Sequence, residues 1–306
     1  MIDPSVKFGT TSSIAPASIG VFGNEGSWYV AALSTAAERR GIRCVRLDYR
    51  QLVSRAGALG NYWEASGERL ADLQAIIIRT MPPGSLEQVV FRMNALAQVE
   101  AVGVTMLNPP RAIECAVDKH LTTTRLALAG LRVPRTVVCE TADLGMAACE
   151  ELGGDVVIKP IFGSEGRGIV RVDSPDLAVR VLRTLERINA VLYLQEFINH
   201  PGYDVRVLVF HGYVLGGIKR FACDDFRTNI ALRGTAKIHD VTDQEAHAAL
   251  TAAAATGVVF AGVDLMYDRS DQLYVIEVNA VPGWQAFQAT TGIDVAEKVM
   301  ATVVPK

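Results

Sequence analysis

Three oxygen-bearing side chains near the C-terminal end have types and a spacing that suit a divalent cation. Asp264 and Glu277 lie on two predicted strands that a short polar turn joins. A turn centred between Ser270 and Asp271 places Asp264 opposite Glu277, and Asn279, two residues further on, shares the face of Glu277. Two facing carboxylates repel each other unless a cation lies between them. This donor set suits Mg²⁺ or Mn²⁺ bound together with substrate phosphates, and a plain surface hairpin is the alternative.

A glycine-rich segment at 163–168, Gly-Ser-Glu-Gly-Arg-Gly, joins two further predicted strands. A dinucleotide fingerprint requires a helix after such a loop, and a P-loop requires Gly-Lys followed by Ser or Thr, so neither motif fits. Exposed backbone amides, with Lys159 before the segment and Arg167 within it, suit a polyphosphate. The alternative is a flexible hairpin with solvated charges. The candidate nucleotide-binding residues of this segment are Gly163, Ser164, Glu165, Gly166, Arg167 and Gly168.

Other charged side chains stand among the apolar residues of predicted strands. They are Glu196, Arg206, Lys219 and Arg220. The loop that follows adds Arg227, Asn229 and Arg233. Each strand residue, taken singly, is better explained by a side chain that points outward than by one that binds a ligand. The five histidines show no metal-ligand spacing, so we interpret them as surface or local structural residues.

Hydrophobic periodicity predicts the elements that position these residues. In residues 1–108, apolar strands alternate with helices, which favours a small parallel α/β unit. The strands predicted there are 19–22, 44–47, 75–78 and 104–107, and the helices are 28–40 and 86–97. An α+β stretch follows, with helices at 111–131, 141–152 and 176–189 and strands at 135–139, 156–159 and 169–172. Mainly antiparallel strands come last, at 191–197, 205–210, 213–219, 262–267 and 273–279, with helices at 243–256 and from about 293.

The composition shows no strong charge bias. The chain has 30 Lys and Arg against 33 Asp and Glu, and no basic stripe, so we expect no nucleic-acid partner. The five cysteines, at 44, 115, 139, 149 and 223, form no CxxC pair, which is typical of reduced thiols in a cytoplasmic protein. The N-terminal residues lack the apolar stretch of a secretory signal. The longest charge-free apolar run is too short and too broken to span a membrane, so we expect no membrane partner.

The motifs between residues 109 and 300 resemble, in their order, an ATP-grasp domain of the RimK-like amino-acid ligase type. Eight pieces carry the resemblance: Asp118-Lys119, Val157–Pro160 with the glycine segment, Gln195–Ile198, Asp204–Arg206, Phe226–Asn229, Arg233-Gly234, Gly262–Asp264 and Ile276–Asn279. The resemblance implies a three-part ATP-grasp fold of the α/β and α+β classes. Its parts would be a pre-ATP-grasp α/β domain on the acceptor side at 1–108, a central lid subdomain at 109–190, and a C-terminal, mainly antiparallel β subdomain with helices at 191–306.

Three stretches resemble more narrowly the tetrahydromethanopterin:α-L-glutamate ligase branch of that family. They are 85–93, 108–114 together with 118–119, and 277–284. The resemblance implies ATP-dependent amide formation, in which an acceptor carboxylate takes the γ-phosphate and the amine of L-glutamate then displaces it. The implied small-molecule substrates are ATP, L-glutamate and a carboxylate acceptor, with two Mg²⁺ or Mn²⁺ ions as cofactors. A homo-oligomer is compatible with this activity.

The same resemblance implies a role for each matched residue. The nucleotide would contact Lys119, Lys159, the glycine segment, Gln195, Glu196, Phe197, Ile198 and Asp204, and the metal would bind Asp264, Glu277 and Asn279. The candidate catalytic residues are Arg227, Asn229 and Arg233. Arg206 and Arg220 are candidates to pair with substrate carboxylates. Arg79 follows a buried strand of the N-terminal unit, where α/β folds place ligand contacts, so it is assigned to the acceptor, and a surface arginine beside a turn is the alternative.

Two other functions stay open at this point. One is a glutamate or amino-acid ligase that acts on a protein C-terminus or a carrier protein. The other is a non-catalytic ATP-binding regulatory module. The intact set of Asp264, Glu277, Asn279, Arg227 and Lys159 counts against the regulatory module. A carrier-protein acceptor favours a charged docking face, which the composition does not show.

Overall fold

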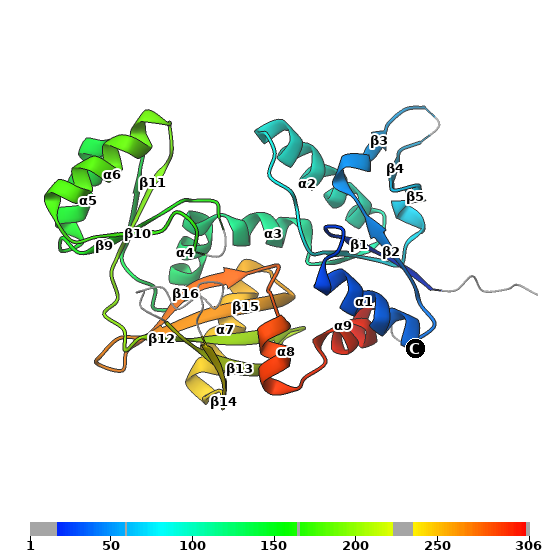
Figure 1. Ribbon diagram of the computed structural model, residues 1–306. Coiled ribbons are helices and arrows are strands. Elements are labelled where there is room, and N and C mark those ends of the chain that lie inside the picture. Colours follow the sequence, from blue (N-terminus) through cyan, green and yellow to red (C-terminus); the bar gives the residue numbers. More distant parts are fainter. Residues whose placement is uncertain (1–16, 59, 164–165, 223–234, 304–306) are drawn as a thin grey trace, which may run out of the picture.

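The N-terminal unit is a parallel sheet, as the alternating pattern predicted. The computed structural model describes residues 17–58, 60–163, 166–222 and 235–303. Figure 1 shows their arrangement in three parts, with the N-terminal unit in blue and cyan. Its strand order is β2 (Arg43–Leu47), β1 (Ser18–Phe22), β6 (Ala75–Ile78) and β7 (Thr105–Leu107), and each neighbouring pair is parallel.

Alternate residues of this sheet serve two apolar clusters, as the period of a strand requires. Ile19 and Ile77 belong to one cluster with α1 (Trp28–Arg39) and the C-terminal helix α9 (Val295–Val303). Ile76 and Ile78 belong to the other, with α2 (Leu86–Ala101). The C-terminal helix therefore completes the N-terminal unit.

A small antiparallel sheet beside β2 was not predicted from the sequence. It consists of β3 (Val53–Arg55), β4 (Tyr62–Ala65) and β5 (Glu68–Arg69), flanked by the short 3₁₀ turns η1 (Tyr49–Gln51) and η2 (Leu70–Asp72). These strands are too short for alternation to stand out from a loop.

The central lobe, in green in Figure 1, has a sheet and a core of its own. Its antiparallel strands are β10 (Val170–Val172), β9 (Val156–Lys159), β11 (Leu192–Glu196) and β8 (Thr136–Cys139), in that order. The helices α5 (Ala142–Glu151) and α6 (Pro175–Arg187) pack on it. Because β11 belongs to this sheet, the central lobe continues beyond the domain boundary expected at residue 190.

The segment before the lobe is two helices rather than the single helix expected at 111–131. α3 (Pro110–Val117) ends where Asp118 begins α4 (Lys119–Leu128) as its N-cap, and Asp118 Oδ1 accepts a hydrogen bond from Leu121 N at 2.9 Å. The α4 helix packs against the C-terminal part, on α7 (Asp243–Thr256) and β16 (Leu273–Asn279). The break at Asp118 thus gives Lys119 the first position of a helix that faces the C-terminal sheet.

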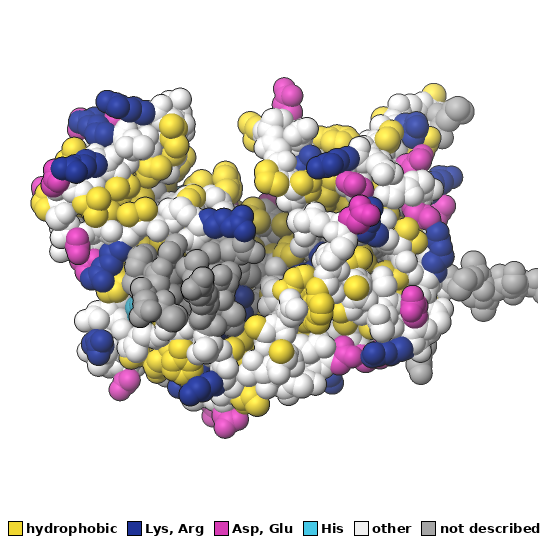
Figure 2. Space-filling view, in the orientation of Figure 1, with side chains coloured by type: hydrophobic (Ala, Val, Ile, Leu, Met, Phe, Trp, Pro, Cys, Tyr) yellow, Lys and Arg dark blue, Asp and Glu magenta, His cyan; other side chains and the backbone are white. Residues whose placement is uncertain are grey.

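The C-terminal sheet has five antiparallel strands. Their order is β14 (Thr235–His239), β13 (Tyr213–Phe221), β12 (Tyr203–Phe210), β15 (Phe260–Tyr267) and β16. Helix α8 (Gln285–Thr291), which the sequence analysis missed, lies beside β13 and β14. Figure 2 shows the surface hollowed between the central lobe and the N-terminal unit.

Candidate active site

The hairpin of β15 and β16 places the two predicted metal-site carboxylates opposite each other. Asp264 pairs with Glu277, and Gly262 pairs with Asn279. Nearer the turn the register shifts by one, with Leu265 opposite Val275, so a bulge lies beside the carboxylate pair. The Asn279 Nδ2 donates to Gly262 O at 3.3 Å, which leaves the amide oxygen of Asn279 as its free ligand atom.

Two arginines from the adjacent strand β12 and from β13 hold the Asp264 carboxylate. Arg206 donates to it through Nε and a terminal nitrogen, both at 2.7 Å, and Arg220 approaches it at 3.0 Å. Arg220 also forms a two-point pair with Asp204. Burial works to raise the pKa of Asp264, but the two guanidinium groups outweigh burial and hold that pKa below its usual value. Asp264 is therefore ionised and fixed before any ligand arrives.

This geometry gives Arg206 and Arg220 a different role from the one predicted from the sequence. Both were assigned to substrate carboxylates, and both pair with protein carboxylates here. Burial alone would lower the pKa of Arg220, yet Asp264 and Asp204 together raise it above its usual value. Arg206 and Arg220 thus position Asp264, and direct contact between these arginines and substrate remains a prediction.

Two lysines approach the carboxylate pair from different parts of the molecule. Lys119, at the start of α4, lies 3.9 Å from Glu277 Oε1 and donates to Gly163 O at 2.9 Å. Lys159, at the end of β9 in the central lobe, donates to Gln195 Oε1 at 2.6 Å. Burial lowers the pKa of Lys159 to about 8, partly against the attraction of Glu277. The lysines therefore bring the central lobe and the C-terminal sheet to one charged centre.

A hydrogen-bonded chain fixes the Lys159 ammonium group. Because Gln195 Oε1 accepts from Lys159, the Nε2 of Gln195 must donate, and it reaches Thr136 Oγ1 at 3.0 Å and Tyr193 Oη at 3.1 Å. Tyr193 Oη in turn lies 2.8 Å from Thr123 Oγ1 of α4. Thr123 stands one turn beyond Lys119 on the same helix. The chain thus links the two lysine-bearing elements, and Gln195 holds Lys159 through its side chain.

Among the described residues, the charged side chains of this centre leave an excess of one positive charge, which suits a polyanionic ligand. The cations are Lys119, Lys159, Arg206 and Arg220, and the anions are Asp204, Asp264 and Glu277. Within the described ranges, no three His, Cys, Asp or Glu side chains are grouped to hold a metal. Two carboxylates and one amide oxygen fit Mg²⁺, which commonly takes its remaining ligands from water and substrate phosphates.

Part of the segment predicted to contact the nucleotide lines a pocket beside the C-terminal sheet. Glu196, Phe197 and Ile198 line a cavity of about 270 Å³ together with the turn between β15 and β16. Glu196 also accepts hydrogen bonds from Arg135 N and Nε, at 2.8 and 2.7 Å, and Arg171 stacks on the Phe197 ring. These contacts hold the segment in place at the pocket.

Comparison with known proteins identifies the family. The RimK-like ATP-grasp domain matches residues 116–303. The chain belongs to the RimK-like ATP-grasp family. It is 32% identical to the tetrahydromethanopterin:α-L-glutamate ligase of Methanosarcina acetivorans, over 89% of this chain and 94% of that protein. It is also 32% identical to the ribosomal protein bS6–L-glutamate ligase of Salmonella paratyphi B, over 92% of this chain and 94% of that protein.

Solved structures confirm the expected three-part ATP-grasp fold. The ATP-grasp ligase PsnB in complex with a minimal precursor matches with a TM-score of 0.76 and 21% identity, over 94% of this chain and 98% of that one. The RimK domain protein of Sphaerobacter thermophilus matches with a TM-score of 0.70 and 20% identity, over 94% and 99% of the two chains. In the part of this ATP-grasp chain that the structure describes, no helix has both the length and the apolar character to cross a bilayer.

Some predicted residues of the RimK-like site lie outside the described residues. They are Ser164, Glu165, Arg227, Asn229 and Arg233. Of the glycine segment, Gly168 is described with a φ of +74°, and a Cβ there would come within 2.8 Å of Pro160 Cγ. Glycine is therefore required at position 168 both for its backbone angle and for space.

Arg79, predicted to contact the acceptor, lies inside the protein. Only 6% of it is exposed, and it donates to Pro282 O at 2.8 Å. Its guanidinium group lies over the rings of both Tyr29 and Trp284, which also contact each other edge to face. Burial lowers its pKa to about 9. Arg79 thus joins the N-terminal unit to the loop that follows Asn279, and acceptor contact by Arg79 remains a prediction.

One residue that helps to assemble the RimK-like site was not predicted from the sequence. Asn108 is buried, its Oδ1 accepts from Val259 N and Phe260 N, and its Nδ2 donates to Phe260 O and Ala280 O. This amide holds the beginning of β15 and the end of β16 against the N-terminal unit. Its position next to two prolines suggested only a domain boundary.

Proposed function

We propose that the protein is an ATP-dependent α-L-glutamate ligase that adds L-glutamate to a small carboxylate acceptor of the tetrahydromethanopterin type. The observation that carries the proposal is the facing pair Asp264 and Glu277, with Lys119 and Lys159 converging on it from two parts of the fold. Facing carboxylates beside converging cations suit a triphosphate and its metal.

The chemistry needs charge placement rather than a nucleophilic side chain. A carboxylate is a poor acylating agent because its leaving group would be oxide, and transfer of the γ-phosphate supplies a better one. Negative charge gathers on phosphate oxygens during this transfer. Lys119 and Lys159 would offset that charge. Because Arg206 and Arg220 are already paired with protein carboxylates, the charged side chains of the site need little rearrangement during the reaction. The glutamate amine would then displace phosphate from the acyl phosphate.

The metal would be held by Asp264, Glu277 and Asn279. Asp264 Oδ1 accepts one hydrogen bond from Arg206, so it keeps a lone pair for a cation. When bound, Mg²⁺ or Mn²⁺ would neutralise charge on the phosphate oxygens of ATP. Two ions would share these three ligand side chains, and oxygens of the substrate would supply further ligands.

Two acceptors deserve testing because relatives named for different acceptors have the same percentage identity to this chain. The ligase of Methanosarcina acetivorans is named for tetrahydromethanopterin and that of Salmonella paratyphi B for ribosomal protein bS6, and each is 32% identical to this chain. We favour the small acceptor because residues 85–93, 108–114, 118–119 and 277–284 resemble the tetrahydromethanopterin branch. Ribosomal protein bS6 is the alternative.

The test incubates the purified protein with ATP, MgCl₂, L-glutamate and one acceptor at a time. Phosphate release and a glutamyl mass increase on tetrahydromethanopterin would support the proposal, and modification of bS6 alone would favour the alternative. Glu277→Gln keeps the side-chain size and removes one anionic ligand, so we expect almost complete loss of turnover with the fold intact. If Glu277→Gln matched the wild-type rate throughout a Mg²⁺ titration, the metal assignment would be wrong.

A further inference from the structure

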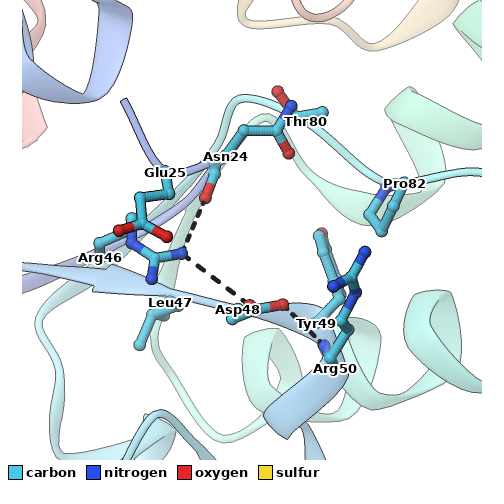
Figure 3. A pocket seen from close by; sticks show the side chains of 10 residues that line it. Asn24, Glu25, Arg46, Leu47, Asp48, Tyr49, Arg50, Thr80 and Pro82 are labelled. Carbon is cyan, nitrogen blue, oxygen red and sulfur yellow. Dashed lines mark hydrogen bonds and ion pairs between the residues drawn. The ribbon is translucent and has the colours of Figure 1, made fainter. Parts of the chain in front are cut away.

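A second pocket lies at the carboxyl edge of the N-terminal parallel sheet. It has a volume of about 180 Å³ and is formed by the loops after β1, β2 and β6. From β1 the chain runs to β2 on one side and later to β6 on the other, so this edge is a topological switch point. Open α/β sheets bind ligands in the crevice at such a point. Figure 3 shows side chains from all three loops around it.

The walls of the pocket are braced by contacts that hold its loops together. Arg46 donates to Gly23 O at 3.4 Å and lies 4.0 Å from Asp48, which connects the loops after β1 and β2. Asp48 Oδ1 accepts from Arg50 N, and Asp48 N donates to Ser66 Oγ, in the turn between β4 and β5. The small sheet that escaped prediction thus supports the loop that carries Arg50.

Two hydrogen-bond donors at this pocket have no described partner. The exposed guanidinium group of Arg50 makes no ion pair or side-chain hydrogen bond with any described residue. Tyr49 is 6% exposed, and its hydroxyl is buried without a partner among the described residues. Burial raises the pKa of Tyr49, so its phenol keeps its proton and remains a donor. In Figure 3 the Tyr49 ring and the Arg50 side chain extend side by side toward Pro82.

Arg79 connects the wall of the pocket to the loop that follows Asn279. Thr80, which lines the pocket, follows Arg79, and Arg79 donates to Pro282 O three residues beyond Asn279. Gly262 on β15 packs closely against Pro282. Asp264, Glu277 and the two lysines are not among the residues that line the pocket, so a group held at Arg50 lies outside the charged centre and is not the reacting one.

We propose that this pocket binds a second, non-reacting carboxylate of the acceptor, held by the guanidinium group of Arg50 with the Tyr49 hydroxyl as a further donor. The inference rests on the proposed ligase function, which requires an acceptor that carries a carboxylate. Arginine suits this task because its planar donors match both oxygens of a carboxylate. The fixed loops supply the preorganisation that such a contact needs.

The direct test uses glutarate as the probe, without ATP, metal or glutamate, with binding followed by ligand-observed NMR. We expect glutarate to bind and its uncharged analogue glutaramide to bind far more weakly. Arg50→Gln should weaken glutarate binding about tenfold, and Arg50→Lys should recover only part of it. The control Arg187→Gln makes the same charge change on α6 and should leave binding unaltered. Equal binding to wild type and Arg50→Gln would overturn the proposal.

A second variant separates binding from folding. Tyr49→Phe removes a buried hydroxyl that has no described partner, so it should keep or raise the Tm while it weakens glutarate binding. A lowered Tm with unchanged glutarate binding would mean that Tyr49 is structural and would count against the site.

Turnover assays distinguish this proposal from the ligase function itself. With tetrahydromethanopterin or bS6 as acceptor, Arg50→Gln should raise the acceptor KM and leave the KM values of ATP and L-glutamate unchanged. A rise in the L-glutamate KM alone would assign the pocket to the amino acid and refute the acceptor site. If neither acceptor were modified while Arg50→Gln still weakened glutarate binding about tenfold, the ligase function would fail and the carboxylate site would stand.

Discussion

The junction between the N-terminal unit and the C-terminal sheet differs sharply from the attachment of the central lobe. The N-terminal unit and the C-terminal sheet share apolar clusters. In one of them, Phe22 and Ile76 of the N-terminal unit lie with Val263 and Val278 of the C-terminal sheet. The buried residues of the lobe form a separate cluster that includes Leu182. A shared core makes two parts one mechanical body, whereas a lobe with its own core moves or unfolds at lower cost.

The lobe meets the rest of the protein through polar contacts near the charged centre. Lys119 reaches Gly163, Tyr193 reaches Thr123, and Val275 N donates to Arg132 O in the segment leading to the lobe. A ligand that bridges Lys159 of the lobe and Glu277 of the body would add to these contacts. Nucleotide binding is therefore expected to stabilise one position of the lobe, since a ligand shifts a population only through contacts that differ between states.

The largest loss of stability is expected from a substitution at the junction between the N-terminal unit and the C-terminal sheet. Asn108→Ala removes four hydrogen bonds of a buried amide and leaves buried backbone groups of β15 unpaired. We expect a loss of about 3–5 kcal/mol in the free energy of unfolding, measured by urea denaturation. The control Asn94→Ala, on the exposed face of α2, should stay within about 0.5 kcal/mol of wild type. Similar losses for both variants would contradict a fixed junction.

The next effect concerns the lobe alone. Leu182 is fully buried on α6, and Leu182→Ala should cost about 2–5 kcal/mol through the cavity it leaves. Because the lobe has its own core, hydrogen exchange should quicken in the sheet of β8–β11 and in α5 and α6, and not in β1 or β15. Leu177→Ala on the same helix is the partly exposed control. Faster exchange throughout the chain would mean that the lobe is not independent.

The sequence predicted features that depend on neighbouring residues, but not those that depend on contacts between distant parts of the chain. Alternation and helical period predicted most strands, both sheet types and the facing pair Asp264 and Glu277, because each depends on neighbours within one element or hairpin. The roles of Asn108 and Arg79 were out of reach, since Asn108 bonds to Phe260, 152 positions away. The break at Asp118 had a visible signal, an aspartate able to cap a helix, which the apolar pattern around it obscured.

A pH effect is expected from the lysine that the lobe contributes. Burial lowers the pKa of Lys159 to about 8, so the ammonium form dominates below that pH and is lost above it. ATP affinity should fall as pH rises through 8, by up to about tenfold per pH unit while Lys159 is the controlling group. Lys159→Arg keeps its charge across this range, and its ATP Kd should stay flat from pH 7 to 9.5. A wild-type Kd that is equally flat would exclude this role for Lys159.

The smallest effect tests the chain that ties the lobe to the body. Tyr193→Phe removes the hydroxyl between Gln195 and Thr123 but keeps the packing of the ring. Gln195 still reaches Thr136, so Lys159 keeps its partner and only the link to α4 is lost. We expect about 1 kcal/mol of destabilisation and a roughly fivefold rise in the ATP KM, with kcat little changed. Thr123→Val cuts the same link from the side of the body, so the double variant should lose little more than either single one. Tyr213→Phe, at an exposed hydroxyl of β13, is the matched control and should leave the KM unchanged. Fully additive effects of Tyr193→Phe and Thr123→Val would show that the two hydroxyls act separately, and the lobe would then be positioned by the Lys119 contacts instead.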